Sequence, residues 1–258
     1  MSKLILNNIA NKLVRAFLKN KIIAPLPIKY TKKLYEAQKL RKLCESKINK
    51  PIAGFKAAGT GIPVLKKLKE KEPFYATVYS HNVLKNKKSV KINKFTMVIE
   101  LEVCYFVKKS FFDFKYKINK NNFKKFIKYI APCIEIVGYR QRKKGIKSLG
   151  DLCSDFGANV KFVVGQKKKY KNNNVKNLKT NISNKKISQS VNGNTNTVYV
   201  NPLNSLLFVL SKLQKDKIKH NQDFYVFTGS TVGVVPILGK GFYKGSINGL
   251  GSVFTKIN

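Results

Sequence analysis

The chain has 258 residues, 43% of them hydrophobic, which is enough to bury the core of one large domain. Its formal net charge at pH 7 is +40, from 52 basic and 12 acidic residues. No apolar run approaches the roughly 18 residues that a membrane-spanning helix requires, so we expect no membrane segment.

Helices are predicted for the first part of the chain. Residues 4–23 space their apolar side chains like an amphipathic basic helix. This pattern is found both in mitochondrial transit peptides and in ordinary first helices. The low serine and arginine content favours an ordinary helix. Two prolines, Pro25 and Pro27, separate it from a second helix expected over 31–47. We therefore treat residues 1–50 as an N-terminal helical segment.

The rest of the chain, residues 51–258, is predicted to be one β-rich body with interspersed helices. The expected strands cover Ile52–Ala57, the extended segment EPFYATVYSHNVL, Thr96–Val107, Ala131–Val137, parts of 151–164 and of 166–196, and residues 223–257 with their seven glycines. The expected helices cover Pro63–Leu68, Lys120–Ile130 and Pro202–Gln214, the last with Asn201 as N-cap and Pro202 in the first position. This order predicts an α+β fold or a β-roll rather than a regular βαβ series.

The net charge and the cysteine pattern allow predictions about binding partners and the cellular compartment. Only four of the basic residues are arginine, the side chain that specific phosphate and base recognition favours, and 26 asparagines accompany the lysines. A joint excess of Lys, Asn and Ile is typical of an A/T-rich coding sequence, so we predict no specific nucleic-acid partner; a polyanion or a membrane surface is the alternative. The four cysteines form no C-x-x-C pair, which predicts buried thiols in the reducing cytoplasm.

Three of the scarce carboxylates lie inside strongly apolar strands. In VIELEVCYFV, Glu100 and Glu102 are two residues apart and therefore project from the same face of a strand. Glu135 occupies the centre of a second apolar strand, APCIEIV. A cation would remove the repulsion between such carboxylates, and oxygen ligands without histidine favour Mg²⁺ or Mn²⁺ over zinc. The pattern thus predicts a divalent metal site, with exposed, solvated glutamates or lysine salt bridges as the alternatives.

The chain resembles the fumarylacetoacetase-like superfamily, on the branch of 2-oxopent-4-enoate hydratases and 4-oxalocrotonate decarboxylases. The matching segments occur in family order from about residue 30 to the end: LYEAQ at 34–38, IAGFK at 52–56, EPF at 72–74, ELE at 100–102, PCIEIV at 132–137, Asp155 within LCSDFGAN, NPLNSL at 201–206, TGS at 228–230 and GLGSV at 249–253.

The resemblance implies a distorted β-roll with N-terminal and peripheral helices, Mg²⁺ or Mn²⁺ held by Glu100, Glu102 and Glu135, and a homo-oligomeric enzyme acting on a 2-oxo or 2-hydroxydienoic acid. It further implies proton transfer by Lys56. Substrate contacts are implied for Thr228, Gly229 and Asp155.

The implied activity is a hydro-lyase that adds water to a 2-hydroxy-2,4-dienoate and yields a 4-hydroxy-2-oxo acid. The alternatives are a 2-oxo-acid decarboxylase or an acylpyruvate hydrolase of the same fold, and, in another class, a non-catalytic basic protein that binds RNA or an anionic surface. Ser80-His81-Asn82 stands where the family's hydratases often carry an aspartate, so the substrate is left open, with His81 as a candidate replacement for the acid.

Overall fold

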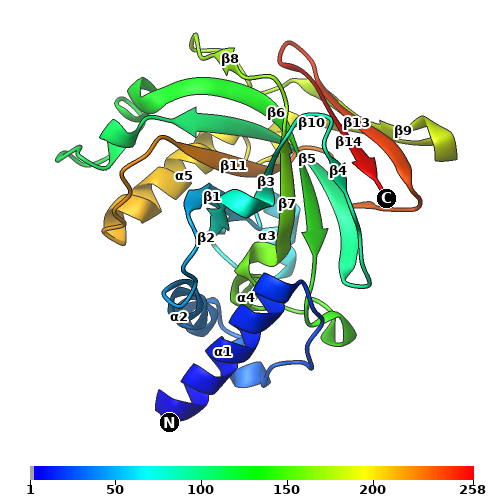
Figure 1. Ribbon diagram of the computed structural model, residues 1–258. Coiled ribbons are helices and arrows are strands. Elements are labelled where there is room, and N and C mark those ends of the chain that lie inside the picture. Colours follow the sequence, from blue (N-terminus) through cyan, green and yellow to red (C-terminus); the bar gives the residue numbers. More distant parts are fainter. Residues whose placement is uncertain (1–2) are drawn as a thin grey trace.

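A curled sheet of nine strands runs through the centre of the computed structural model, which describes residues 3–258 (Figure 1). Its main path follows the order β2-β1-β11-β5-β6-β7-β3, with β12 paired to β5 and β8 paired to β6. The strands of this sheet are β1 (Ile52–Ala58), β2 (Phe74–Tyr79), β3 (Val83–Lys85), β5 (Thr96–Val107), β6 (Ile127–Gly138), β7 (Asn159–Val164), β8 (Lys168–Lys169), β11 (Phe224–Ser230) and β12 (Val235–Pro236).

A second sheet of five strands packs against one face of the first. Its strands, in the order β10-β9-β13-β14-β4, are β10 (Gln189–Asn194), β9 (Lys179–Asn184), β13 (Gly241–Ile247), β14 (Gly251–Ile257) and β4 (Ser89–Val90). At Gly245 the backbone of β13 comes so close to the first sheet that an added Cβ would lie 2.5 Å from Leu101 Cδ1. The main core fills this interface, and it includes Leu101, Val103, Ile134 and Val253.

Within residues 3–258, five α-helices lie around the sheets (Figure 1). They are α1 (Lys3–Lys19), α2 (Leu34–Glu45), α3 (Ile62–Lys67), α4 (Leu149–Ser154) and α5 (Pro202–Lys215). Figure 1 shows α1 and α2 at the bottom of the view, away from the second sheet, which lies at the upper right. None of the helices among residues 3–258 combines the length and hydropathy needed to cross a membrane.

The N-terminal helix α1 is packed into the body of the molecule. Its buried side chains, among them Leu13 and Phe17, share a hydrophobic cluster with Leu40 of α2, with Tyr79 at the end of β2, and with Phe156. The helix ends at Lys19, four residues before its predicted end.

Most predicted elements are present, but helix α4 was not predicted and one predicted helix is wrong. The strand Thr96–Val107 has its expected bounds, and Asn201 caps α5 by accepting a hydrogen bond from the Leu203 N–H at 3.0 Å. The helix expected over Lys120–Ile130 is wrong, because β6 already begins at Ile127. The pairing of Ile127 with Val107 extends the β5–β6 ladder, and this tertiary pairing overrides the helical spacing of the local apolar residues.

Candidate metal centre

The three glutamates predicted from the sequence come together on neighbouring strands. Glu100 and Glu135 are direct partners in the β5–β6 ladder, and Glu102 follows two residues later on the same face of β5. One carboxylate oxygen from each lies within 4.8 Å of the others. Glu102 and Glu135 are fully buried and Glu100 is half-buried. Among the residues that the structure describes, no other group of three acids, histidines or cysteines has this proximity.

Lys56 of β1 reaches into the same cluster. Its side chain is 4% exposed, and its Nζ donates to Glu135 Oε1 at 2.5 Å and to the carbonyl oxygen of Gly157 at 3.0 Å. Its ammonium also lies 5.9 Å from the centre of the Phe162 ring. The sheet order explains how β1, which is remote in sequence, arrives here, since β11 alone separates β1 from β5.

The cluster holds three acids and one base, and burial works against the charged form of the acids. Burial, then the charge of Glu135, raises the pKa of Glu100 to about 8, although Lys56 opposes the shift. The same causes hold the pKa of Glu102 well above its usual range. For Lys56, burial lowers the pKa but the three glutamates outweigh it, so the pKa lies above its ordinary value and the side chain is an ammonium. One ammonium therefore faces three acids, and without a cation the raised pKa values favour the neutral form of Glu100 and Glu102.

The unpaired oxygens test whether the residues fit a metal ion. Within residues 3–258, both carboxylate oxygens of Glu102 and Oε2 of Glu135 have no hydrogen-bond partner despite being buried. Buried polar atoms without partners are costly and rare in folded proteins. A hard divalent cation prefers carboxylate oxygen ligands and would satisfy these atoms, so the set of residues fits Mg²⁺ or Mn²⁺.

The predicted substrate residues Thr228 and Gly229 lie on β11 beside Glu102. An irregularity in the pairing of β11 with β5 falls between Phe227 and Ser230, and Gly229 there has φ +105°. The Gly229 amide is close enough to favour the charged form of Glu102. The Thr228 hydroxyl donates to the Val103 carbonyl oxygen at 2.8 Å, so it is hydrogen-bonded within the sheet in this state. Substrate binding by either residue stays a prediction.

Asp155, the third predicted substrate contact, is buried away from solvent. It pairs with Arg140, whose Nη1 lies 2.9 Å from Asp155 Oδ1 and whose backbone N–H donates to Oδ2 at 2.7 Å. Its role as a substrate contact stays a prediction. His81, by contrast, is exposed and stacks on Tyr79 at 6.1 Å between ring centres.

Two residues near the cluster were not singled out in the sequence. Gly157 supplies the carbonyl that binds Lys56, and the only local signal for it is the glycine of DFGAN. Thr60 follows β1 and packs over Gly229, where an added Cβ would meet Thr60 Oγ1 at 2.0 Å. This contact explains why a glycine is required at 229, beyond its positive φ.

Comparison with known proteins identifies the fold. No protein-family model matches the chain, and no curated protein matches its sequence. Among solved structures, 4-oxalocrotonate decarboxylase from Pseudomonas putida G7, complexed with magnesium and adipate, has a TM-score of 0.86 at 16% identity and covers 100% of this chain and 99% of its own.

More distant neighbours cover less of the chain. Fumarylpyruvate hydrolase from Pseudomonas aeruginosa, in complex with Mn²⁺ and pyruvate, has a TM-score of 0.59 at 11% identity, with 79% of this chain and 88% of its own covered. 5-Carboxymethyl-2-hydroxymuconate delta-isomerase from Mycobacterium smegmatis has a TM-score of 0.54 at 11% identity and covers 80% of both chains.

Proposed function

We infer the function from the fumarylacetoacetase-like fold that the chain shares with these neighbours, a fold that confirms the predicted α+β architecture with its distorted β-roll. We propose that the protein is a metal-dependent lyase that acts on a 2-oxo acid or its 2-hydroxydienoic tautomer. The observation that carries the proposal is the cluster of three carboxylates whose buried oxygens lack partners, with Lys56 beside it. Structural neighbours crystallised with Mg²⁺ or Mn²⁺ and with small carboxylic acids support it.

Glu100, Glu102 and Glu135 would hold Mg²⁺ or Mn²⁺. When bound, the ion would polarise a 2-oxo group and offset the negative charge that develops on its oxygen as a neighbouring bond forms or breaks. The bulge at Gly229 places a backbone N–H beside this cluster, where it can bind and orient the carboxylate of the substrate.

Lys56 is the group that would move the proton at its Nζ. In the absence of a cation the carboxylates keep Nζ charged and engaged with Glu135. A positive charge at the carboxylates would weaken that hold and favour release of the proton, as buried lysines beside cations generally show. Phe162 of β7 and Phe227, the partner of Lys56 on the neighbouring strand β11, add apolar surface beside it.

Two reactions fit this arrangement, and the first is hydration of a 2-hydroxy-2,4-dienoate to a 4-hydroxy-2-oxo acid, as the family resemblance implies. The second, decarboxylation of a 2-oxo dioic acid, is supported by the full-length similarity to 4-oxalocrotonate decarboxylase. Hydrolysis has weaker support, because the hydrolase neighbour covers less of the chain. Cytoplasmic location, a homo-oligomeric state and the lack of a specific nucleic-acid partner stay predictions of the sequence.

Product analysis tests the proposal. Purified protein with Mg²⁺ or Mn²⁺ is incubated with 2-hydroxy-2,4-pentadienoate and, separately, with a 4-oxalocrotonate-type dioic acid. We expect either a 4-hydroxy-2-oxo acid or CO₂ to form, and Glu102→Gln to abolish it, while Glu72→Gln on the surface leaves it intact. Turnover of neither compound, or full turnover by Glu102→Gln in EDTA, would refute the proposal.

A further inference from the structure

Three consecutive residues next to Lys56 have left-handed backbone conformations. The φ angles of Phe156, Gly157 and Ala158 are 55°, 69° and 57°. Residues other than glycine rarely adopt such values, and they persist only where their surroundings hold them, often at functional sites. The middle carbonyl accepts the hydrogen bond from Lys56 Nζ, and a Cβ added at Gly157 would lie 3.3 Å from Lys56 Cδ. This left-handed turn (Phe156–Ala158) therefore forms one of the two anchors of the lysine; Glu135 is the other.

A buried ion pair holds both ends of the left-handed turn. Asp155, just before it, accepts two hydrogen bonds from Arg140 through its backbone N–H and its guanidinium. Arg140 also donates through Nη2 to the carbonyl oxygen of Asn159, just after the turn, at 3.1 Å. The Asn159 amide in turn donates to the Phe156 carbonyl oxygen at 2.6 Å, and the Ala158 N–H donates to the Asp155 carbonyl oxygen at 2.7 Å.

Arg140 is fixed by aromatic rings. Its guanidinium carbon lies 4.8 Å from the ring centre of Phe17, on α1, and 5.2 Å from that of Phe95. Phe17 also packs on Phe156 with 4.4 Å between ring centres, and the Ile23 N–H donates to the Arg140 carbonyl oxygen. The N-terminal segment thus holds the ion pair and the left-handed turn in one cluster.

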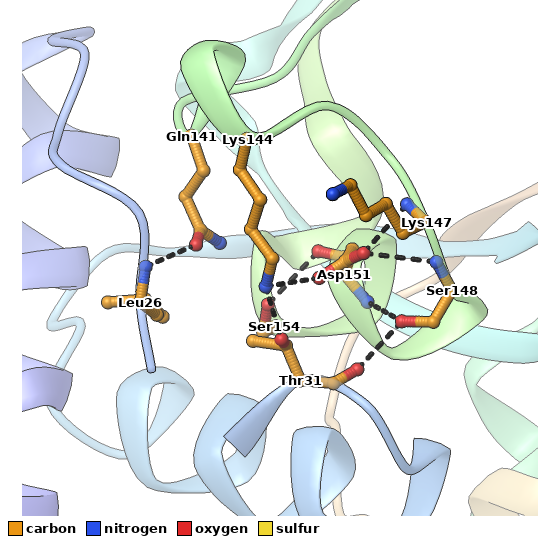
Figure 2. Close-up of polar contacts among 8 residues, drawn as sticks. All are labelled: Leu26, Thr31, Gln141, Lys144, Lys147, Ser148, Asp151 and Ser154. Carbon is orange, nitrogen blue, oxygen red and sulfur yellow. Dashed lines mark hydrogen bonds and ion pairs between the residues drawn. The ribbon is translucent and has the colours of Figure 1, made fainter. Parts of the chain in front are cut away.

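The segment that leads from Arg140 to Asp155 is tied to the N-terminal segment at further points (Figure 2). The Leu26 N–H donates to Gln141 Oε1 at 2.7 Å, and the Ser148 hydroxyl donates to the Thr31 carbonyl oxygen at 2.8 Å. Figure 2 shows Lys144 between Asp151, at 2.7 Å, and the Thr31 side chain. These contacts hold the segment before Asp155 against the N-terminal segment.

We propose that Arg140 and Asp155 are positioning residues for proton transfer: they fix the left-handed turn, so that the Gly157 carbonyl aims the Nζ of Lys56 into the three-glutamate cluster. The inference rests on the proposed function, because it assigns Lys56 the proton. The glutamates themselves lie on β5 and β6, outside this cluster. Loss of the ion pair therefore weakens the aim of Lys56 and leaves the metal ligands in place.

The test uses Asp155→Asn and Arg140→Lys, with Asp223→Asn as control because Asp223 forms an exposed ion pair with Lys128 on the far part of the sheet. We expect Asp155→Asn to lower kcat at least tenfold with KM and Mg²⁺ affinity changed less than twofold. Arg140→Lys keeps the positive charge, so we expect its kcat to lie between those of Asp155→Asn and wild type. Asp223→Asn behaves as wild type. Equal losses of kcat, Mg²⁺ affinity and folding would show a merely structural role and overturn the proposal.

A readout independent of turnover separates this inference from the proposed function. The Nζ resonance of buried Lys56 is assigned by its loss in Lys56→Met, using ¹⁵N-lysine-labelled protein. We expect Asp155→Asn to shift or broaden that resonance; an unchanged resonance overturns the proposal even if no substrate is ever turned over. If Asp155→Asn fails to fold, Arg140→Lys gives the same test, because it removes the guanidinium that binds Asp155 and Asn159 and keeps the positive charge.

Discussion

Glu100 of β5 and Glu135 of β6 face each other directly across an antiparallel ladder, in a chain that has only 12 acidic residues. Cross-strand partners have Cβ atoms about 5 Å apart, and like charges at that distance repel. Glu102 adds a third carboxylate, and Lys56 neutralises only part of the charge. The site is therefore less stable without a divalent cation than with one, and the first two predictions follow from this imbalance.

Glu102→Gln is expected to stabilise the protein in EDTA. The substitution replaces a buried acid, whose pKa burial holds well above its usual range, by a neutral side chain of the same shape, and the gain in unfolding free energy should be about 1–3 kcal/mol. Thermal denaturation in EDTA measures it, with Glu72→Gln at an exposed ion pair as the control. A lower midpoint for Glu102→Gln would mean that its carboxylate is already satisfied in the metal-free protein.

Lys56→Met is expected to have the opposite effect. It removes the cation that pairs with buried Glu135, and breaking a buried ion pair costs about 3–5 kcal/mol. Because the carboxylates then have no partner, added Mg²⁺ should restore more stability to this variant than to wild type. Denaturation with and without Mg²⁺ checks this, and equal Mg²⁺ shifts in the two proteins would contradict it.

Acid should destabilise the protein partly through Asp151. Burial raises the pKa of Asp151, but hydrogen bonds from Lys144, the Lys147 N–H and Thr31 bring it below its ordinary value. An acid with a lowered pKa in the folded state contributes stability above its unfolded pKa of about 3.9, and this is lost as the pH falls through the folded value.

Asp151→Asn should therefore lower the free energy of unfolding at pH 7. It should also make that free energy depend less steeply on pH below about pH 4. Urea denaturation between pH 3 and pH 7 gives both quantities. Asp113→Asn, at an exposed position, should leave the pH profile unchanged. An Asp151→Asn profile parallel to wild type would exclude Asp151 as the source.

Val200→Gly should stabilise the protein. Val200 has φ +67°, a conformation that costs a residue with a Cβ roughly 1–2 kcal/mol, and its side chain is 50% exposed, so little packing is lost. We expect a gain of about 1 kcal/mol in thermal denaturation. Val234→Gly is the matched control, since Val234 is 69% exposed without a positive φ, and it should be neutral or destabilising. Equal effects at both positions would contradict the account of strain at Val200.

Local pattern was sufficient for much of the fold and for part of the site. Alternation in VIELEVCYFV is enough to place Glu100 and Glu102 on one face, because the side-chain period of a strand is a local property. Asn201 and Pro202 mark the start of α5, because the capping of a helix is also set by local sequence. The partner strand of Glu135 and the approach of Lys56 depend on the order of strands in the sheet, and the family resemblance was needed to single out Lys56.

Other features could not be predicted from local pattern. Residues 120–130 have helical spacing, yet Ile127–Ile130 extend the β5–β6 ladder, because pairing outweighs propensity. Asp155 lies in a segment that the resemblance assigns to substrate binding, and its partner Arg140 is revealed only by the fold. Phe156 and Ala158 carry no sequence signal for positive φ, because they are held there by that ion pair and by Phe17.

The most direct measurement of the central claim is the thermal shift of wild type and Glu102→Gln in EDTA, Mg²⁺ or Mn²⁺, each with and without oxalate. Oxalate mimics the enolate of a 2-oxo acid. A ligand at 100 times its dissociation constant adds about 2.7 kcal/mol of stability. The account predicts that oxalate stabilises wild type only when the metal is present and that Glu102→Gln loses both responses. A wild-type protein that responds to neither metal nor oxalate would show that Glu100, Glu102 and Glu135 do not form a metal site.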